Sequence, residues 1–400
     1  MATSETLDVP IIGELTRADL YRTASMIPTL VADIPDGGYE NLSEYPITGG
    51  VDIAAATRAR AEDQGALLMS SGGTTGAPKL SWLPYDLGLE RQRRTWDPLD
   101  ASSVLLNLFN PGRLWGSHYY IQELARISHS VVLPTGPFDK SEMPNWVEVF
   151  QRAGVNALAG NPTTLADFAD ACLEHGMDLP IKTIIWMAEP WAPQKLESIG
   201  VAFPQASLWG NYGAVETWVM GTSEPECAPN VLHLLPEHMI ECHDGGALIS
   251  RRADGWAVPL LRYNLKDHVV PTQCACGRDR AMRVLGRAGD TVSLRSAIFR
   301  ADEVLDTVRK VSGVVDAQIV LSSASSEEET SASAMTIDFI TDGADHDIAQ
   351  ISDAVRDHLI TGFVHMASIV TKYPDALHVE HVDNLTRIKR TNKTPAIVRR

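Results

Sequence analysis

A glycine-rich segment in the first quarter of the chain has the composition of an anion-binding loop. Residues 70–79 read Ser-Ser-Gly-Gly-Thr-Thr-Gly-Ala-Pro-Lys, directly after the apolar run Ala66–Met69. Glycines let backbone N–H groups approach an anion closely, and serine and threonine hydroxyls add donors around it. Lys79 adds a positive charge, so the segment is suited to holding the β- and γ-phosphates of a nucleotide. It is not a Walker loop, because Pro78 precedes Lys79 and Leu80 follows it.

Five further polar motifs follow the glycine-rich segment along the chain. They are Ala188-Glu189-Pro190, Asn211-Tyr212-Gly213-Ala214-Val215-Glu216, Arg262-Tyr263-Asn264-Leu265-Lys266-Asp267, Gly286-Arg287-Ala288-Gly289-Asp290 and Thr391-Asn392-Lys393-Thr394-Pro395. Taken singly, each of them fits an ordinary turn, a loop cap or a solvated charge, as the glycine-rich segment also does. Together they extend in order from Ser70 to Lys393, over most of the chain, which makes coincidence a poor explanation.

In this order the motifs resemble the signature of the adenylate-forming superfamily, which contains acyl-CoA ligases, adenylation domains and luciferases. The resemblance implies an AMP-forming enzyme that uses ATP and Mg²⁺ to activate a carboxylic acid as an acyl-AMP. It implies catalytic roles for Lys79, for Glu216 as the ligand of Mg²⁺, and for Lys393 near the C-terminus. Lys389 lies four residues before Lys393 and remains the alternative catalytic lysine.

The same resemblance assigns the ATP site to positions in several motifs. Tyr212 would stack on the adenine, and Asp267 would accept hydrogen bonds from the ribose hydroxyls, with Arg287 beside it. The complete implied set is Ser70, Ser71, Gly72, Gly73, Thr74, Thr75, Gly76, Glu189, Pro190, Asn211, Tyr212, Asp267 and Arg287.

Two further segments are similar to the phenylacetate–coenzyme A ligases within this superfamily. Trp115-Gly116-Ser117-His118-Tyr119 resembles their segment beside the acyl pocket, and Cys274-Ala275-Cys276-Gly277-Arg278 resembles a second element. The likeness implies a small aromatic acid, transfer to coenzyme A, and a pocket made of Trp115, Ser117, His118, Tyr119 and Gly213. In such a pocket His118 could orient a carboxylate. Trp209 and Tyr212 would extend the aromatic lining, although large aromatics such as Trp115 and Trp209 more often fill a hydrophobic core.

Cysteine and histidine residues in the middle of the chain predict a zinc site. Cys274 and Cys276 are not spaced like the common Cys-x-x-Cys knuckle, so two further ligands must come from elsewhere. Cys227 and His233 lie in a stretch that resembles the Glu-Cys…Leu-His segment of the same ligases. The four residues would make a Cys₃His set, which suits a closed tetrahedral structural Zn²⁺. The rival ligands are Cys242 and His243, and the alternative without metal is a pair of free thiols on a turn.

Several positions depart from the superfamily's pattern. Val215 replaces the hydroxyl residue before Glu216, and Lys266 stands where glycine is usual. Gly289 and Ser296 alter the hinge before the C-terminal part and the segment after it, which serve acyl transfer. The alternatives to coenzyme A are therefore a carrier-protein thiol, an amine or another small nucleophile in a biosynthetic pathway. A nucleotide-binding relative without turnover is the rival from another class of protein.

Composition narrows the range of partners. The formal net charge is −17, from 51 acidic and 34 basic residues. Apart from a short basic tail, Arg387–Arg400, no basic stripe is present for nucleic acid to bind. No apolar run approaches the length needed to cross a bilayer, and the first residues lack a secretory signal. Five cysteines do not suggest a disulfide framework and fit a reducing compartment. We expect a cytoplasmic protein without nucleic-acid or membrane partners, and the oligomeric state, a homodimer included, stays open.

Apolar runs alternating with amphipathic stretches predict an α/β fold with largely parallel strands. The expected strands are Ser103–Phe109, Ser130–Pro134, Ala157–Gly160 and Thr183–Met187. The helices that should cover them are Ile121–Ile127, Trp146–Ala153 and Thr163–His175.

The character of the sequence changes after about Gly286. A helix–strand–strand–helix–strand order predicts a compact α+β lid of about a hundred residues. The expected elements are Ala301–Val311, Val314–Leu321, Ala334–Ile340, Asp347–Gly362 and Ala376–His381. The polar stretch Ser322–Ser333 is expected to be a mobile hairpin loop. We therefore predict an ATP- and acid-binding adenylation domain over residues 1–286 and a mobile C-terminal lid over residues 287–400.

Overall fold

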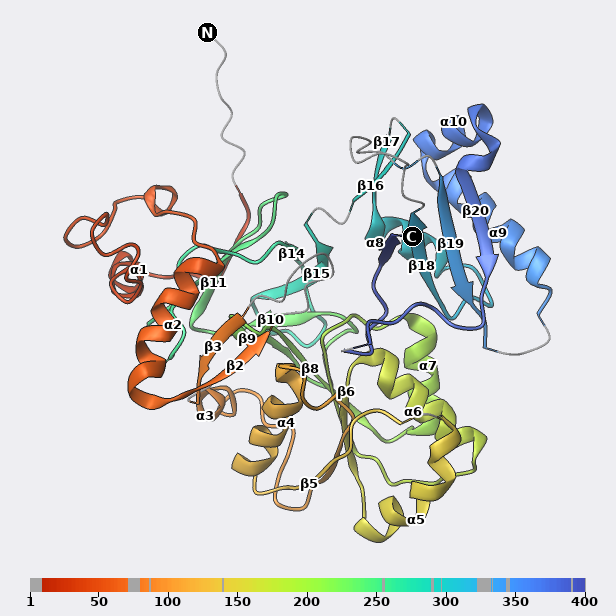
Figure 1. The fold of residues 1–400 in the computed structure, drawn as a ribbon, viewed down its shortest axis with the longest axis horizontal. Helices are drawn as coiled ribbons and strands as arrows, with labels where there is room; N and C mark the ends of the chain where they lie inside the picture. Colours follow the sequence, from red (N-terminus) through yellow and green to blue (C-terminus); the bar gives the residue numbers. More distant parts are fainter. Residues whose placement is uncertain are drawn as a thin grey trace. The chain divides into compact units, whose positions relative to one another are not determined.

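The chain forms two compact units of mixed α/β structure (Figure 1). The computed structural model describes residues 9–399, except for 71–79, 86–87, 139, 254–255, 289–290, 296, 322–331, 333, 343–345 and 390. The first unit comprises Met1–Asn161, Ala171–Ala188 and Gln205–Ala288, and the second comprises Pro162–Asp170, Glu189–Pro204 and Gly289–Arg400. The predicted α/β fold class is confirmed.

A nine-stranded sheet forms the centre of the first unit, with the strand order β14-β15-β10-β9-β8-β7-β6-β4-β5. Its parallel part consists of β4 (Val104–Asn107), β5 (Val131–Pro134), β6 (Ala157–Gly160), β7 (Thr183–Met187) and β8 (Ser207–Ala214). Its antiparallel part consists of β9 (Trp218–Ser223), β10 (Leu232–Leu234), β14 (Asp267–Pro271) and β15 (Ala281–Arg287). Strands β6 and β7 have the predicted bounds, because strands buried on both faces are continuous apolar runs and stand out in the sequence.

Helices follow the parallel strands along the chain. They are α4 (Gly116–Ile127), α5 (Met143–Ala153), α6 (Pro162–Glu174) and α7 (Pro193–Ala202). Helix α4 buries Tyr120, Ile121 and Leu124, which share one face of a 3.6-residue repeat. Helix α5 carries a proline in its first turn and ends at Gly154, whose φ of 73° gives a left-handed cap. Local signals of this kind explain why the predicted helices are found, with α4 and α5 starting earlier than expected.

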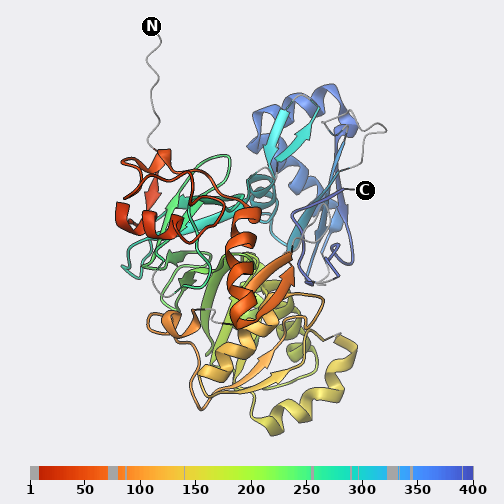
Figure 2. The ribbon, with the colours of Figure 1, turned by 60° about the vertical axis from the view of Figure 1, so that its left-hand side comes forward.

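Two smaller β-structures complete the first unit. An antiparallel sheet has the order β1 (Ile11–Ile12), β11 (His238–Glu241), β12 (Leu248–Arg251), β13 (Tyr263–Asn264). A hairpin pairs β2 (Ala66–Ser70) with β3 (Leu80–Pro84), and helix α2 (Gly50–Gln64) lies beside it (Figure 2). The remaining helical elements are α1 (Arg17–Ala24), α3 (Leu89–Gln92) and the 3₁₀ turns Leu42–Glu44 and Lys140–Glu142.

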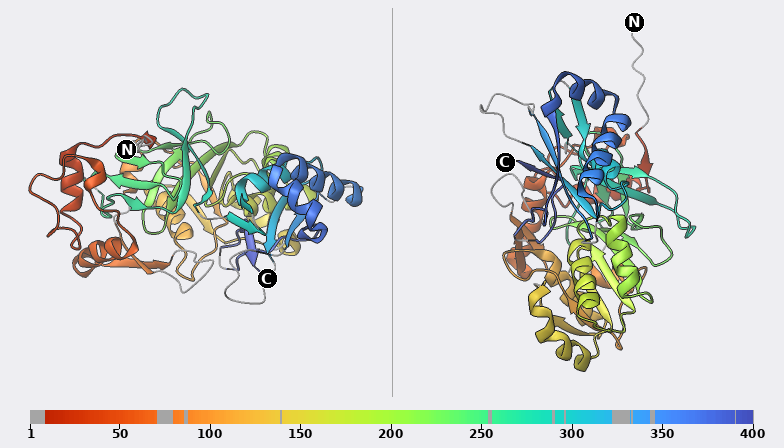
Figure 3. Two further views of the ribbon diagram at one scale, coloured as in Figure 1. Left: turned by 90° about the horizontal axis from the view of Figure 1, so that it is seen from above. Right: turned by 90° about the vertical axis from the view of Figure 1, so that its right-hand side faces the viewer.

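The second unit contains a four-stranded sheet with the order β20-β19-β18-β21. Its strands are β18 (Asp316–Leu321), β19 (Met335–Ile340), β20 (Leu377–His381) and β21 (Ile397–Arg399), and a separate hairpin pairs β16 (Thr291–Leu294) with β17 (Ala297–Arg300). The C-terminal helices are α8 (Ala301–Val308), α9 (Ile348–Gly362), α10 (Val364–Lys372) and the 3₁₀ turn Pro374–Ala376. Helices α8 and α9 pack on the sheet and enclose an apolar core with it (Figure 3).

The five elements predicted for the C-terminal part are all present, with ends within three residues of the expected ones. The hairpin β16–β17, helix α10 and strand β21 were missed, because each is short and has no repeat long enough to register in the sequence. Of the predicted mobile loop Ser322–Ser333, all but Ala332 lies outside the described residues. Among the helices of the described residues, none combines the length and apolar character needed to cross a bilayer.

A buried carboxylate organises the second unit. Asp316 at the start of β18 is 1% exposed and accepts hydrogen bonds from Nζ of Lys195 at 2.6 Å and Nε of Arg309 at 3.0 Å. Burial raises the pKa of Asp316, but Lys195 and Arg309 outweigh it and hold that pKa at about 2. Lys195 also donates to Oγ1 of Thr163 at 2.9 Å, so one charged group connects helices α6 and α7 with strand β18.

A buried guanidinium organises the first unit in a comparable way. Arg251 at the end of β12 is 1% exposed and lies 4.2 Å from the ring centre of Trp256. Its Nε donates to Nε2 of His238 at 2.7 Å, and its other nitrogens donate to carbonyl oxygens of Thr217, Val219 and Val258. Burial lowers the pKa of Arg251 to about 9, so the group stays charged at neutral pH. Arg251 therefore joins β9, β11 and β12.

We expect Arg251→Met to destabilise the protein by about 3 kcal/mol or more, because three buried carbonyls lose their donor together. Urea unfolding at neutral pH measures the change. Arg126→Met is the matched control, since the Arg126 side chain is 68% exposed and pairs with Glu123 of its own helix, and it should stay within about 0.5 kcal/mol. Equal effects of the two substitutions would contradict the central role of Arg251.

Candidate active site

The turn of the β8–β9 hairpin positions Glu216. A Cβ on Gly213 would lie 2.3 Å from the carbonyl oxygen of Trp218, so only glycine allows the two strands to approach this closely. Oγ1 of Thr217 accepts the N–H of Ala214 at 3.2 Å across the turn. Arg251 holds the carbonyl of Thr217, the residue after Glu216. The backbone on both sides of Glu216 is thus fixed by specific contacts.

One carboxylate oxygen of Glu216 accepts a hydrogen bond, and the other has no hydrogen-bond partner among the described residues. Its Oε1 accepts the hydroxyl of Tyr263 at 3.1 Å. Its Oε2 is buried and has no hydrogen-bond partner among the described residues. Burial, together with the neighbouring Glu216, raises the pKa of Tyr263, which keeps that hydroxyl protonated as a donor. A buried carboxylate oxygen without a donor is what a magnesium ligand needs, because Mg²⁺ prefers oxygen ligands and supplies the missing positive charge.

Asp267, Arg287 and Tyr212 form a second polar cluster in the first unit. Asp267 begins β14 and Arg287 ends β15, and the two residues face each other in the register of the hairpin. Nη1 of Arg287 donates to Oδ1 of Asp267 at 2.9 Å, and the hydroxyl of Tyr212 donates to Oδ2 at 2.7 Å. Burial raises the pKa of Asp267 although Arg287 and Tyr212 oppose the rise. The Arg287 side chain is 56% exposed and so presents its remaining donors to solvent.

Lys266 occupies a position whose backbone explains the usual glycine there. Its φ is 56°, in the left-handed region that side chains other than glycine seldom adopt. The side chain of Asn264 accepts the N–H of Lys266 at 2.8 Å, which stabilises the turn before Asp267. The departure from the superfamily pattern is therefore accommodated locally, and Asp267 keeps its place.

The predicted acid pocket divides into core residues and accessible residues. Trp115 is 6% exposed. Trp209 packs against a hydrophobic core cluster that includes Trp96, whose ring it contacts edge to face at 6.3 Å. Both tryptophans therefore serve as core residues. Tyr119 is 37% exposed, and its ring lies 5.9 Å from that of the buried His118.

His118 is fixed in one tautomer. Its Nδ1 donates to the carbonyl oxygen of Phe109 at 2.7 Å, because that oxygen can only accept. Burial lowers the pKa of His118, so the ring is neutral and its Nε2 is an acceptor. A hydroxyl or an N–H group on a ligand suits this nitrogen better than a bare carboxylate does.

The remaining predicted ATP-site residues have different surroundings. Asn211 is buried, and its Nδ2 donates to the hydroxyl of Tyr120 at 2.6 Å. In the second unit, Oε1 of Glu189 accepts the N–H of Thr163 at the start of α6, at 2.7 Å. Ser70 ends β2 and is buried.

The two candidate catalytic lysines near the C-terminus differ in exposure, and most of the predicted phosphate loop lies outside the described residues. Lys393 is half-buried and Lys389 is exposed. Residues 71–79, which contain Lys79 and most of the phosphate loop, lie outside the described residues, as do the hinge residues Gly289 and Asp290 and also Ser296. The strands on either side of residues 71–79 are paired, Ser70 with Leu80.

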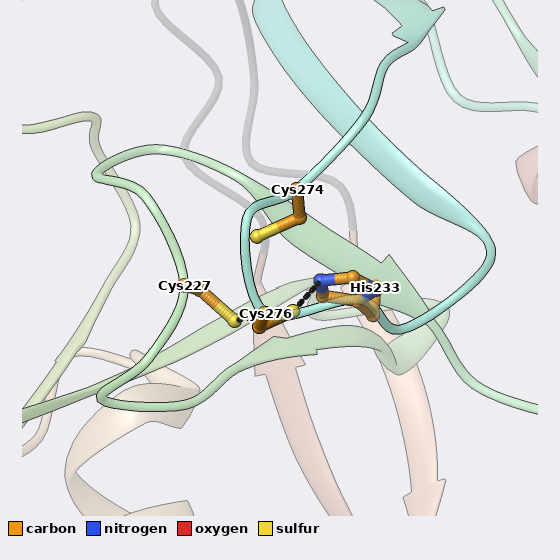
Figure 4. A group of neighbouring side chains, drawn as sticks. All are labelled: Cys227, His233, Cys274 and Cys276. Atoms are coloured by element: carbon orange, nitrogen blue, oxygen red, sulfur yellow. Dashed lines mark hydrogen bonds between the residues drawn. The ribbon is translucent and has the colours of Figure 1, made fainter.

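Four thiol and imidazole groups come together near the loop between β14 and β15 (Figure 4). The ligand atoms of Cys227, His233, Cys274 and Cys276 all lie within 4.8 Å of one another. The rival residues Cys242 and His243 are not part of this group, and Nε2 of His243 lies 3.4 Å from Glu241 instead. The structure therefore brings together the four predicted zinc ligands, and the rival ligands Cys242 and His243 lie outside this group.

Comparisons with known proteins agree on the fold. The chain is 22% identical to indoleacetate–lysine synthetase of Pseudomonas savastanoi over an alignment of 237 residues, which covers 56% of this chain and 59% of that protein. The structure of 2-hydroxyisobutyryl-CoA ligase in the postadenylation state matches 96% of this chain and 88% of its own, with a TM-score of 0.68 and 13% identity. ATP-bound MatB from Rhodopseudomonas palustris matches 84% and 70%, with a TM-score of 0.58 and 16% identity. No family model matches the chain.

The chain has the fold of the adenylate-forming superfamily, as the order of its motifs predicted. Within that fold, sequence reasoning missed Tyr263 as the partner of Glu216 and Arg251 as the support of the same turn. Tyr263 was inside a recognised motif and could have been found there. Arg251 lies in no motif and gave no signal.

The raised pKa of Asp267 predicts a pH-dependent stability difference. Above the ordinary value of 3.8 the unfolded chain ionises this carboxyl readily, whereas burial makes ionisation costly in the folded state. We expect Asp267→Asn to be more stable than the parent at neutral pH without ligand, and to lose this advantage as the pH falls toward 3.8. Urea unfolding at several pH values measures it.

Asp97→Asn is the control for this comparison, because the Asp97 side chain is 46% exposed and pairs with Arg93 on the surface. Its effect should be small at every pH. A loss of stability in Asp267→Asn at neutral pH would mean that the contacts of Asp267 with Arg287 and Tyr212 outweigh burial.

Proposed function

We propose that this chain is an AMP-forming ligase that activates a small carboxylic acid with ATP. The observation that carries the proposal is the buried Oε2 of Glu216, which has no hydrogen-bond partner among the described residues. It occurs together with the cluster of Asp267, Arg287 and Tyr212, which joins the β8–β9 hairpin to the β14–β15 hairpin of the same sheet. The fold and the ordered motifs support the same activity. ATP, Mg²⁺ and an acid substrate are the implied ligands.

In the proposed reaction, an oxygen of the substrate carboxylate attacks the α-phosphorus of ATP. The bond from that phosphorus to the bridging oxygen breaks, and pyrophosphate leaves with the electron pair, so an acyl-AMP remains. Negative charge accumulates on the phosphate oxygens, and catalysis therefore depends on positioning and on cations. Bound Mg²⁺ would offset charge on the leaving pyrophosphate, and Lys79 and Lys393 would add fixed positive charges.

The first unit has groups suited to the nucleoside part of ATP. Each carboxylate oxygen of Asp267 accepts one hydrogen bond, which leaves lone pairs for the ribose hydroxyls. The ring of Tyr212 is held by its hydroxyl, which makes it a rigid surface for an adenine. Burial and the adjacent Asp267 raise the pKa of Tyr212 well above its usual value, so this donor persists at neutral pH.

Glu216 provides the test of the metal assignment. Glu216→Gln keeps the shape but removes the charge, so we expect pyrophosphate release to need at least about tenfold more Mg²⁺, since hydrogen bonds and ligand bonds to charged groups are worth about 1.5–3 kcal/mol. Steady-state rates across a magnesium titration measure this. Glu123→Gln, at a half-buried residue of helix α4 that pairs with Arg126, is the control and should leave the titration unchanged. An unchanged titration in Glu216→Gln would remove Glu216 from the metal site.

The acid and its final acceptor are the finer part of the proposal. The likeness to phenylacetate–coenzyme A ligases favours an aromatic acid and coenzyme A. A specific observation favours an amine as the second candidate, because the curated relative is named for joining indoleacetate to lysine. The neutral Nε2 of His118 would accept a hydrogen bond from a hydroxyl or N–H group on such a substrate. A carrier-protein thiol is the remaining candidate acceptor.

Two further parts of the proposal concern the protein as a whole. We propose that it is located in the cytoplasm and that residues 287–400 form a mobile lid.

The decisive experiment measures pyrophosphate release from Mg-ATP with a panel of aryl and small aliphatic acids. We expect acid-dependent release that falls at least about a hundredfold in Lys393→Ala, as removal of a group that stabilises developing charge does. Lys389→Ala is the matched control, because this exposed lysine lies nearby in sequence, and it should lose less than about threefold. The reverse order would make Lys389 the catalytic lysine.

The acceptor is identified by adding coenzyme A or free amino acids to the acid that releases pyrophosphate, and by mass analysis of the product. A thioester supports the first candidate and an amide the second. ATP binding without pyrophosphate for any acid would reject the enzymatic proposal and favour a nucleotide-binding relative without turnover.

A further inference from the structure

The hairpin of β14 and β15 has two chemically distinct ends. At one end Asp267 and Arg287 form their ion pair. At the other end Pro271 pairs with Met282, and the connecting residues 272–280 carry Cys274 and Cys276. Gly277, with a φ of 78°, tightens this connection, and its N–H donates to the carbonyl of Cys274 at 3.1 Å. One short hairpin therefore links the thiol cluster to the cluster assigned to ATP.

The distances from Cys276 to Cys227 and to His233 fit a shared tetrahedral ion. Sγ of Cys276 lies 3.9 Å from Sγ of Cys227 and 3.3 Å from Nε2 of His233. Zinc with bonds of about 2.3 Å to sulfur and about 2.1 Å to nitrogen would place such atoms roughly 3.8 Å and 3.6 Å apart. The observed distances differ from these by only a few tenths of an ångström. All four side chains point to one small volume in Figure 4.

Neighbouring groups orient the ligands as they do in metal sites. Nδ1 of His233 donates to the carbonyl oxygen of Asp279 at 2.6 Å, which leaves Nε2 as the atom that faces the cysteines. Nη2 of Arg278 donates to Sγ of Cys227 at 2.9 Å, and the N–H of Glu224 donates to the same sulfur at 3.3 Å. Arg278 also pairs with Glu224. A pair of free thiols on a turn would need neither hydrogen-bond donors directed at a sulfur nor an imidazole held in one tautomer. The contacts of Cys227 and His233 therefore favour the metal site over the free thiols.

We propose that Cys227, His233, Cys274 and Cys276 bind one structural Zn²⁺, and that this ion fixes the hairpin that carries Asp267 and Arg287. Three thiolates and one imidazole select zinc over Mg²⁺ or Ca²⁺, which prefer oxygen. Four protein ligands complete a tetrahedron, so no position stays open for water or substrate. The second half of the inference rests on the proposed function, because only there do Asp267 and Arg287 hold a nucleotide.

The sheet topology explains why the hairpin needs such a support. Strand β14 lies at the edge of the nine-stranded sheet and pairs there with β15, which pairs in turn with β10. The contact between β15 and β10 is short, with Leu232 opposite Met282 and His233 opposite Ala281. Zinc would add a cross-link from the hairpin loop to β10 through His233 and to the turn after β9 through Cys227. The edge hairpin, which pairs with the rest of the sheet through the short β15–β10 ladder, would then have a second connection to the interior of the sheet.

The metal is tested first, without any assay of activity. The full chain, expressed in medium that contains zinc, is analysed for bound metal, and we expect about one zinc per chain. Cys276→Ser and Cys274→Ser should each lower this by at least about tenfold, in the range that loss of a metal-site group causes. Cys242→Ser is the matched control and should keep the full zinc content, since Cys242 lies outside the ligand group.

Loss of zinc in a cysteine variant could also result from misfolding of the variant. Reversible removal of zinc from the parent protein avoids this ambiguity, because no residue is changed. A chelator applied to the parent protein should strip the zinc, and added zinc should restore it. Cobalt in its place should give the visible absorption of a tetrahedral thiolate site. A parent protein with less than about a tenth of a zinc per chain, or equal zinc in Cys276→Ser and the parent, overturns the metal site. Loss of zinc in Cys242→Ser overturns this ligand set.

The support of the hairpin is tested by hydrogen exchange and nucleotide binding with and without zinc. Removal of the metal should raise the exchange of residues 267–287 more than that of β18–β19, and should weaken ATP binding by at least about tenfold, as small misplacements of binding groups do. Unchanged exchange over residues 267–287 overturns this half of the inference. If zinc controls the exchange but ATP does not bind in either state, the proposed function fails and the metal site stands.

Discussion

The β-structure of the first unit depends on the burial of one guanidinium, that of Arg251. A buried arginine costs several kcal/mol in desolvation unless its donors are used. Here they are used almost completely, by carbonyls of Thr217, Val219 and Val258 and by His238, while the planar face lies on Trp256. Because these acceptors come from different strands, the four-stranded sheet and the nine-stranded sheet must hold one arrangement to satisfy the charge. Glu216 adjoins Thr217, so the rigidity reaches the candidate site directly.

A second arginine supports the other half of the candidate site in a similar way. Arg262 is buried, pairs with both oxygens of Glu241 at 2.9 Å and donates to the carbonyl of Tyr45 at 2.7 Å. It opens the motif that continues through Tyr263 to Asp267. The first residue of that motif therefore anchors the backbone, and the later residues face Glu216 and Arg287. A motif conspicuous in sequence thus combines a structural residue with residues suited to binding.

The sequence predicted the parts of this structure that leave a continuous local pattern. The strands β6 and β7 are apolar runs, and the structure brings together the predicted ligand set of Cys227, His233, Cys274 and Cys276. Arg251 was not predicted, because Arg251 and Arg252 are equivalent in sequence and only the tertiary fold buries the first. The antiparallel strands β10 and β13 were also missed, since runs of two or three residues have no measurable period. The left-handed backbone of Lys266 was indicated only indirectly, by its place where glycine is usual.

The antiparallel end of the nine-stranded sheet carries both the candidate binding residues and the side chains that stabilise its strands. Glu216 lies in the β8–β9 turn, His233 on β10, and Asp267 and Arg287 at one end of the β14–β15 hairpin, so the polar groups occupy successive strands of one sheet. Parallel strands obtain their support from covering helices, whereas no helix interrupts the described residues from β9 to β15, and these strands approach an edge of the sheet. Their order therefore has to come from side chains. Buried arginines provide it at the β8–β9 turn and at the start of the Arg262–Asp267 motif, and the thiol–imidazole cluster is the corresponding group at the loop of the edge hairpin. On this argument the charged and metal-ligating residues outside the catalytic set are as necessary to the site as the residues that would touch ATP.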